Sequence, residues 1–341
     1  EILSGLVGSE MCIRDSLPPL DCDLLVIGSG AAGLACAVTA AWHGLKVIVV
    51  EKDSTFGGAS AWSGGWMWVP GNPLARRAGI HENPQQPRTY LKHELGERYD
   101  AARIDAFLDN GPQMVAFFEQ HTALQFVDGN GIPDIHGQVP GAGIEGHQVI
   151  AAPYDARAIG PLLKRLRKTL RETSFLGMPI MAGADLGAFL SMTRSFRSLL
   201  HVAGRFARHL RDLALHGRAM HLVNGVALIG RLGKSAEDLG VNLLESTPAR
   251  SLLRNSQGVQ GALVDTPEGP REIRARRGVL LAAGGFANDL PRRQALFPRA
   301  QGPDEHLALP PRSCCGDGIR LGEQAGACLL YTSPSPRDQR G

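Results

Sequence analysis

Three glycines and a downstream acid form the pattern with the clearest chemical meaning in this chain. Gly28, Gly30 and Gly33 are spaced as Gly-x-Gly-x-x-Gly, and Glu51 follows Gly33 by 18 residues. In this pattern the first glycine permits a tight turn, the second lets the backbone approach a pyrophosphate, and the third lets a helix pack closely on a strand. A carboxylate at the position of Glu51 accepts hydrogen bonds from a ribose hydroxyl. The spacing therefore predicts a dinucleotide-binding site.

Two strands and a helix are needed to position these residues, and residues 23–52 contain the pattern for them. An apolar run precedes Gly28, small apolar residues follow Gly30, and a second apolar run ends at Glu51. This order predicts a buried strand, a turn, a helix and a second strand, with the helix N-terminus presenting free N–H groups to phosphates. Residues 24–45 contain no Asp, Glu, Lys or Arg over 22 positions, but the strand–turn–helix order favours a buried unit over a membrane span.

A second glycine-rich block begins six residues after Glu51, at residues 57–65 (Gly-Gly-Ala-Ser-Ala-Trp-Ser-Gly-Gly). Two glycine pairs separated by small residues let a backbone lie flush against a flat ligand, and an ordinary Gly/Ser loop is the alternative. At this position the block resembles the second FAD-contacting loop of the fumarate reductase/succinate dehydrogenase flavoprotein superfamily. Within it, residues 63–70 (Ser-Gly-Gly-Trp-Met-Trp-Val-Pro) are most similar to the 3-ketosteroid Δ1-dehydrogenase branch. The resemblance implies FAD as the cofactor, with NAD as the lesser option.

Two further motifs lie late in the chain. Residues 274–286 read as a strand that runs into Ala-Ala-Gly-Gly at 282–285, after predicted strands at 241–253 and 259–266. In the superfamily an Ala-x-Gly-Gly strand end leads back to the flavin-binding sheet. A Gly-Asp-Gly helix start lies near the flavin, and residues 316–318 are similar to it. For Asp317, a helix N-cap with no ligand is the alternative interpretation.

The resemblance implies an α/β fold, in which a Rossmann-like FAD-binding domain of the glutathione-reductase type carries an inserted α+β cap domain. Residues 17–75 and 221–327 are expected to form the FAD-binding domain, which would be incomplete here, and residues 76–220 the substrate-covering cap. The expected cofactor contacts are Gly28, Gly30, Ala31, Ala32, Gly33, Glu51, Lys52, Gly58, Ala59, Ser60, Ser63, Gly64, Gly65, Ala283, Gly284, Gly285 and Asp317.

The two ends of the chain differ from the rest. Residues 1–16 show no periodic pattern and no initial methionine, and residues 328–341 break off a helix where a further strand is expected. Both stretches resemble translated sequencing-adapter sequence, which is excluded from fold reasoning. Natural disordered tails are the alternative. On the first interpretation the natural protein begins near Leu17 and continues past Ala327, and this chain is a fragment.

Composition limits the possible classes of protein. The net charge of +3 is too small to indicate nucleic-acid binding, and 43% hydrophobic residues suffice for a sizeable core in two domains. Six cysteines show neither a disulfide framework nor metal-ligand spacing, so no metal site is predicted and a reducing, cytoplasmic setting is expected. The N-terminal stretch contains Glu1 and Glu10 and lacks the continuous apolar core of a signal peptide.

Helical patterns dominate the segment between the two sets of motifs. Apolar residues recur at three- to four-residue spacing in 103–120, 161–174 and 198–215, which predicts helices there. Residues 161–218 contain 11 Lys and Arg against 3 Asp and Glu. A basic amphipathic pair of helices can bind an anionic membrane surface or an acidic partner. The favoured interpretation is instead that the charges form the solvated face of helices whose other side packs inward.

The predicted function follows from the flavin that the resemblance implies. Flavin N5 can take a hydride from one carbon while a base removes a proton from its neighbour, which leaves a double bond next to a carbonyl. We therefore expect an FAD-dependent dehydrogenase of CH–CH bonds, similar to a 3-ketosteroid Δ1-dehydrogenase. Its small-molecule substrate would be an apolar ketone, steroid-like or otherwise polycyclic, and its electron acceptor is unidentified. The alternatives are a fumarate-reductase-like enzyme that reduces an unsaturated acid, an inert fragment, and a protein that binds membrane surfaces through its basic helices.

The sequence does not identify a catalytic residue. Tyrosines do much of the polar work in ketosteroid dehydrogenases, but this chain has only four, and the loop 131–136 carries isoleucines where that family usually has a cap-domain tyrosine. His136, His147 and Tyr154 lie in or near this loop-rich region and can act as acid or base, although loop histidines are more often structural. In the superfamily several catalytic groups come from the C-terminal part, which this chain is expected to lack.

Overall fold

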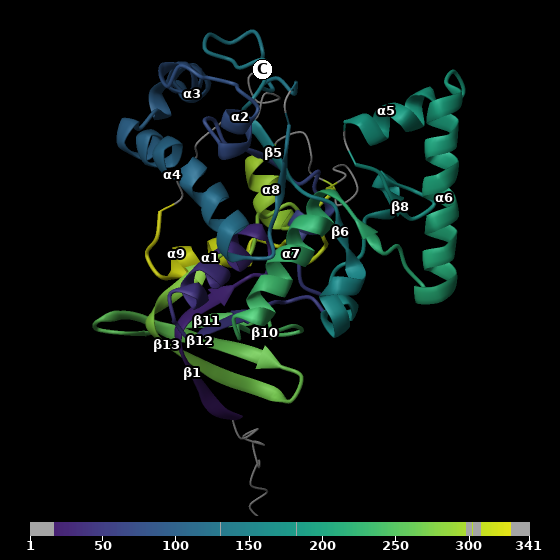
Figure 1. Cartoon of the computed structure of the whole chain (residues 1–341). Helices are drawn as coiled ribbons and strands as arrows, with labels where there is room; N and C mark the ends of the chain where they lie inside the picture. The colour runs from purple at the N-terminus through teal and green to yellow at the C-terminus, as the bar shows by residue number, and fades with distance from the viewer. Residues whose placement is uncertain (1–16, 130, 182, 298–301, 303–307, 329–341) are drawn as a thin grey trace, which may run out of the picture.

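A six-stranded mixed sheet forms the lower layer of the molecule (Figure 1) in the computed structural model, which describes residues 17–129, 131–181, 183–297, 302 and 308–328. The strands lie in the order β10-β2-β1-β13-β12-β11. The first four are mutually parallel, and β12 and β11 continue the sheet in antiparallel pairing. Their bounds are Leu17–Ile27 (β1), Val47–Val50 (β2), Asn242–Leu244 (β10), Ala249–Asn255 (β11), Gly258–Thr266 (β12) and Gly269–Leu281 (β13).

Helix α1 (Ala31–Trp42) joins β1 to β2, which confirms the predicted strand–turn–helix–strand order. Side chains alternate along a strand, so Val26 packs with Ala37 of α1 whereas Leu25 and Ile27 belong to the core cluster of the opposite face. Helix α7 (Asn224–Asp238) packs beside α1, and both contribute to the largest core cluster. The apolar run before the glycines is therefore buried on both faces, as in a parallel sheet.

A second layer of helices and short strands lies above the sheet in Figure 1. β3 pairs with β5, which pairs with β4, in a three-stranded sheet. β3 belongs to the segment 17–75 that is predicted to bind FAD, whereas β4 and β5 belong to the predicted cap, 76–220. The predicted domain boundary therefore runs through this sheet. The division into domains stays a prediction. The helices and strands of this layer are β3 (Trp66–Trp68), α2 (Pro73–Arg77), α3 (Gln85–Leu95), α4 (Ala101–His121), β4 (Phe126–Asp128), β5 (Gln148–Ala151), β6 (Tyr154–Asp155), β7 (Ser174–Phe175), β8 (Met178–Pro179), α5 (Ala184–Ser191), α6 (Phe196–His216) and β9 (His221–Leu222).

The predicted helices at 103–120 and 198–215 are confirmed by α4 and α6, but the predicted helix at 161–174 is wrong. A 3-10 segment covers Ala156–Lys164 and is kinked at Gly160, which has a φ of 65°. Leu166 then forms a bridge to Phe56 and is 1% exposed. Tertiary pairing with the loop after β2 overrides the helical spacing of the leucines there.

The predicted strand at 241–253 is two strands at opposite edges of the sheet, β10 and β11. Between them Ser246 has a φ of 51°, a backbone conformation that ends a strand. Ser246 N donates to Asp53 O at 2.8 Å, and Thr247 N donates to Glu51 O at 2.7 Å. The break therefore brings the segment after β10 against the acid at the end of β2.

The interpretation that 198–215 packs its apolar side inward is also wrong. Leu199, Leu210 and Leu213 of α6 are exposed, and His209 and Asp212 are buried. No helix in the part of the chain that the structure describes is long and apolar enough to cross a membrane. Of the predicted terminal stretches 1–16 and 328–341, all residues except Cys328 lie outside the described residues.

Candidate functional site

The turn between β1 and α1 leaves no room for side chains at two of its glycines. Gly28 has a φ of +107°, and a Cβ there would lie 2.3 Å from Ala282 O. A Cβ on Gly33 would lie 2.0 Å from Gly28 O. Ala282 N donates to Ile27 O at 2.8 Å, so the end of β13 lies directly against the turn. The predicted roles of a tight turn and a close helix–strand approach fit this packing.

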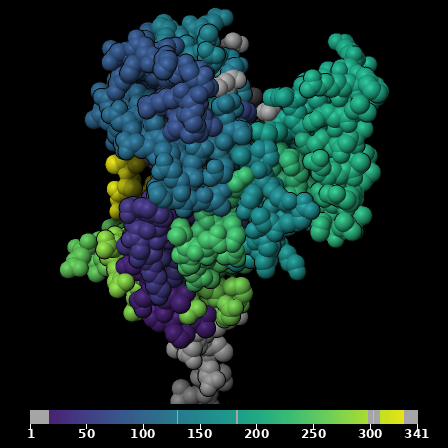
Figure 2. Space-filling model, viewed as in Figure 1, coloured from purple at the N-terminus to yellow at the C-terminus, as the bar shows by residue number. Residues whose placement is uncertain are grey.

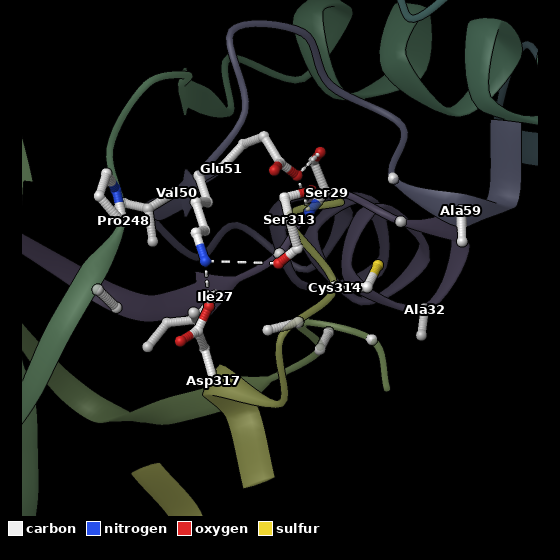
Figure 3. A pocket seen from close by; sticks show the side chains of 18 of the residues that line it. Ile27, Ser29, Ala32, Val50, Glu51, Ala59, Pro248, Ser313, Cys314 and Asp317 are labelled. Carbon is white, nitrogen blue, oxygen red and sulfur yellow. Dashed lines mark hydrogen bonds and ion pairs between the residues drawn. The ribbon is translucent and has the colours of Figure 1, made fainter. Parts of the chain in front are cut away.

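Glu51 connects the glycine turn to the loop after β2. Its carboxylate accepts hydrogen bonds from Ser29 N at 3.1 Å, from Ser29 Oγ and from Asp53 N at 2.9 Å. Ser29 Oγ in turn accepts a bond from Gly57 N at 3.0 Å. Figure 3 shows the Glu51 and Ser29 side chains pointing toward each other. Glu51 is only 7% exposed, and these donors supply the hydrogen bonds that a buried carboxylate needs.

A cavity of 280 Å³ opens beside this cluster (Figure 3). This volume is close to the lower end of the roughly 300–1,000 Å³ of small-molecule pockets. Five segments of the chain line it: the turn after β1, the end of β2 with the loop after it, the segment after β10, the residues after β13, and residues 313–317. The lining residues are Ile27, Gly28, Ser29, Gly30, Ala31, Ala32, Val50, Glu51, Lys52, Gly58, Ala59, Ser60, Thr247, Pro248, Ala249, Ala282, Ala283, Gly284, Ser313, Cys314 and Asp317.

The cavity is built mainly from backbone and small side chains at the N-terminus of α1. Ala31 N donates to Ser60 Oγ at 3.0 Å, and a Cβ on Gly30 would lie 3.3 Å from the same oxygen. The second glycine-rich block is therefore held against the start of the helix. Free N–H groups and the positive end of the helix dipole favour a phosphate at this place.

Two ion pairs lie at or near the cavity, and the first joins two of its lining residues. Lys52 Nζ lies 2.8 Å from Asp317 Oδ2. Burial alone would lower the pKa of Lys52, but the hydrogen bond and charge of Asp317 raise it. Burial would likewise raise the pKa of Asp317, but the bond from Lys52 lowers it. Both groups are charged at neutral pH. Asp317 is the first residue of α9 (Asp317–Gln324), whose N-cap is Gly316, so the alternative interpretation of Asp317 as the N-cap is wrong.

The second ion pair joins Arg167 to Asp53. Asp53 Oδ2 also accepts a bond from Ser313 Oγ at 2.6 Å, and the Arg167 guanidinium lies 5.0 Å from the centre of the Trp62 ring. Trp62 and Asp53 belong to the segment that follows β2, whereas Arg167 comes from the segment predicted as cap. These contacts connect the predicted cap to the loop that lines the cavity.

Twelve of the predicted cofactor contacts line the cavity and five do not. Gly33 packs α1 on β1, and a Cβ on Gly65 would lie 2.6 Å from the backbone of Asn224 in α7. The others outside the lining are Ser63, Gly64 and Gly285. Lining residues that the sequence reasoning missed are Ile27, Ser29, Val50, Thr247, Pro248, Ala249, Ala282, Ser313 and Cys314. Adjacency to the glycine motifs could have indicated Ile27, Ser29, Val50 and Ala282, whereas the others have no local signal.

The residues considered as acid or base lie away from this cavity lining. His147 is 1% exposed, with Nδ1 2.9 Å from Asp134 Oδ1 and Nε2 3.3 Å from Glu82 Oε1. His136 Nδ1 lies 2.8 Å from Glu94 Oε2. The pKa of Tyr154 is raised by burial, which the charge of Arg231 opposes only in part. Both histidines are thus bonded to carboxylates of the protein, and these contacts are structural.

A protein-family model described as "FAD binding domain" matches residues 23–334. The chain belongs to the FAD-binding domain family. Its cofactor is FAD, as predicted. It is a member of the fumarate reductase/succinate dehydrogenase flavoprotein superfamily. The predicted α/β fold with a Rossmann-like FAD-binding sheet is also confirmed. A cavity lined by backbone at a helix N-terminus, with an acid at the end of β2, fits the adenosine and pyrophosphate groups of FAD.

Curated relatives carry more specific names. A 4-oxocyclohex-2-ene-1-carboxylate 5-dehydrogenase of Sinomonas cyclohexanicum is 37% identical over 84% of this chain and 48% of its own length. A 3-oxosteroid 1-dehydrogenase of Mycobacterium tuberculosis is 34% identical over 90% of this chain and 54% of its own length. The chain spans about half the length of the curated relatives it matches.

Among solved structures, the fold is similar to a 3-ketosteroid Δ1-dehydrogenase from Sterolibacterium denitrificans in complex with 1,4-androstadiene-3,17-dione. The TM-score is 0.83 and the identity 28%, with 92% of this chain and 56% of the other covered. The FAD-binding protein described here is thus related in sequence and in fold to enzymes whose names specify dehydrogenation of ring ketones.

Cys314 provides a test of where FAD binds. It lines the cavity. Burial is the main cause that raises the pKa of its thiol, and the negative charges of Asp53 and Glu51 raise that pKa further. Because only the thiolate is nucleophilic, we expect alkylation by iodoacetamide to become half-maximal above the ordinary thiol pKa of about 8.5. If FAD binds in this cavity, it should slow the alkylation further, by about tenfold or more, because it would cover the thiol.

Peptide mass spectrometry measures the rate at each cysteine. Cys36 on α1 is half-buried, does not line the cavity and also has a pKa raised by burial, so it is the internal reference. A labelling rate at Cys314 that does not change on addition of FAD would contradict the placement of FAD in this cavity.

Proposed function

We propose that this protein is an FAD-dependent dehydrogenase that introduces a carbon–carbon double bond next to a ring ketone. The observation that carries the proposal is the similarity, over most of this chain, to two differently named dehydrogenases whose substrates share a ring carbonyl. One acts by name on a cyclohexene carboxylate and the other on a steroid. The shared element is the oxo group on a six-membered ring, so a ketone of this class is the proposed substrate.

In this proposal the residues of the chain bind and orient the cofactor. Glu51 binds the adenosine ribose, while the start of α1 and the loop at Gly58–Ser60 bind the pyrophosphate. Lys52 and Asp317 line the cavity beside the start of α9. FAD, when bound, supplies the hydride acceptor of the reaction. We assign no catalytic acid or base to the described residues, because the candidates His136 and His147 are bonded to carboxylates.

Anaerobic flavin bleaching tests the proposal. The purified protein with bound FAD should lose its oxidised-flavin absorbance on addition of a 3-ketosteroid or of 4-oxocyclohexane carboxylate. Each can lose a proton from the carbon next to its carbonyl and donate a hydride from the following carbon. The reduced protein should not be reoxidised by fumarate. If neither ketone bleaches the flavin but fumarate reoxidises the protein after chemical reduction with dithionite, the fumarate-reductase-like alternative is favoured. A flavin-loaded protein that responds to none of these would contradict the proposal and leave the inert-fragment alternative.

A further inference from the structure

Residues 165–168 of the predicted cap lie against the loop that follows β2. The 3-10 segment Ala156–Lys164 leads to them, and Figure 2 shows teal atoms of this part of the chain beside the green of α7. Two backbone hydrogen bonds fix the contact: Phe56 N donates to Arg165 O at 3.0 Å, and Arg167 N donates to Phe56 O at 3.1 Å. Phe56 is fully buried, so the core of the protein determines where Arg167 lies.

The guanidinium of Arg167 contacts an acid and an aromatic ring. Its Nη2 donates to Asp53 Oδ2, and its Cζ lies 5.0 Å from the centre of the Trp62 ring. The Arg167 side chain is 11% exposed, and its Nε is buried with no acceptor within reach among the described residues. Removing one partner of a largely buried ion pair leaves an uncompensated charge, which is costly. Arg167 and Asp53 therefore depend on each other for compensation of their charges.

Asp53 brings its negative charge close to the cavity, although it does not line it. Its Oδ2 accepts a bond from Ser313 Oγ at 2.6 Å, and its backbone N donates to Glu51 Oε1 at 2.9 Å. Both Ser313 and Glu51 are lining residues. After burial, the charges of Asp53 and Glu51 are the next causes that raise the pKa of the Cys314 thiol, which also lines the cavity. The charge of Asp53 thus acts on the space proposed for the anionic pyrophosphate of FAD, and like charges in proximity weaken binding.

We propose that Arg167 is a positioning residue of the FAD site, which neutralises Asp53 and so lets the loop after β2 accept an anionic cofactor. The ammonium of Lys52, on the same loop, is bonded to a different acid, Asp317, at 2.8 Å. The cation on Asp53 is supplied by the predicted cap, which in this way contributes to cofactor affinity from outside the cavity lining. The inference rests on the part of the proposed function that places FAD in this cavity, and not on the reaction of the flavin.

Titration of the apoprotein with FAD, followed by flavin fluorescence, tests this inference. Arg167→Met removes the charge and keeps much of the side-chain length, and it should weaken FAD binding by about tenfold or more. The loss should be smaller at high salt, because ions screen Asp53 from the phosphates. Adding Asp53→Asn to Arg167→Met should restore the affinity to within about threefold of the parent. The asparagine is uncharged, and its Oδ1 can still accept the bond from Ser313 Oγ.

Two further variants separate charge from side-chain packing. Arg167→Lys keeps the charge and should bind FAD within about threefold of the parent. Arg165→Met is the matched control, because Arg165 Nε donates to Glu245 Oε1 at 2.7 Å and neither residue lines the cavity. Its FAD affinity should also stay within about threefold of the parent, whatever its Tm.

Parental FAD affinity in Arg167→Met would overturn the proposal. So would a loss that Asp53→Asn does not restore, because lost packing on Trp62 would then explain it. Alkylation of Cys314 in the parent reports separately on where FAD binds. If FAD protects Cys314 and Arg167→Met binds FAD as the parent does, the role of Arg167 is wrong and the placement of FAD stands. If FAD does not protect Cys314, the placement itself is wrong.

Discussion

Replacing Gly28 by alanine should yield a protein that retains less than about a tenth of its FAD. The backbone at Gly28 has a φ of +107°, where a side chain is strained by about 1–2 kcal/mol. The new Cβ would also lie 2.3 Å from Ala282 O, so the end of β13 must move. Because Ala282, Ala283 and Gly284 line the cavity, this displacement would reach an FAD bound there as proposed. We expect an additional loss of several degrees in Tm.

The measurements are the ratio of flavin to protein after purification and the Tm with and without added FAD. Gly44→Ala is the matched control, because Gly44 has a φ of +81° but a Cβ added there would have no heavy atom within 4 Å. It lies beyond the other end of α1 from the turn. It should lose only the cost of backbone strain and keep its FAD. Equal flavin loss in the two variants would show that strain alone, and not the approach of β13, causes the effect.

The local part of the site could be predicted from the sequence because its determinants are local. Gly28, Gly33 and Glu51 act within one strand–helix–strand unit, and each role follows from a spacing that the chain itself displays. The second glycine-rich block was predictable only as a resemblance. The structure shows how this block is held against the start of α1, because Ser60 Oγ accepts the hydrogen bond from Ala31 N.

The distant walls of the cavity could not be predicted in this way. Thr247 lines it because Thr247 N donates to Glu51 O across the sheet, and Ser313 lines it because its hydroxyl bonds Asp53. Neither contact leaves a pattern in the neighbouring residues, since each depends on the order of strands in the sheet. The helix predicted at 161–174 is wrong for the same reason, because Leu166 pairs with Phe56, which is distant in the sequence.

Helix α6 shows a different limit of sequence reasoning. Its periodicity predicts a helix correctly, but periodicity does not specify which face is buried. The usual assumption that the apolar face packs inward fails here because Arg205, His209 and Asp212 find partners on the inside. An amphipathic pattern therefore locates a helix more securely than it assigns the side that contacts the protein.

Glu51→Gln should weaken FAD binding by about 100-fold, since hydrogen bonds to a charged group contribute roughly 1.5–3 kcal/mol each. Glutamine has nearly the same shape as glutamate, but one carboxylate oxygen becomes an NH2 group. Ser29 N donates to Oε2 and Asp53 N donates to Oε1. In either orientation of the amide, the NH2 therefore faces a backbone N–H. The turn and the loop after β2 would separate, and the acceptor for the ribose would be lost.

Titration of the apoprotein with FAD, followed by flavin fluorescence, measures this affinity. Glu245→Gln is the matched control, because Glu245 is a largely buried carboxylate just after β10 that bonds Arg165 at 2.7 Å but does not line the cavity. It should lower stability and leave the FAD affinity within about threefold of the parent, because its carboxylate bonds Arg165 and neither lines the cavity nor bonds Glu51. The decisive quantity is the rise in Tm on adding FAD. If that rise is the same in Glu51→Gln as in the parent, Glu51 stabilises the fold and does not contribute to holding the cofactor.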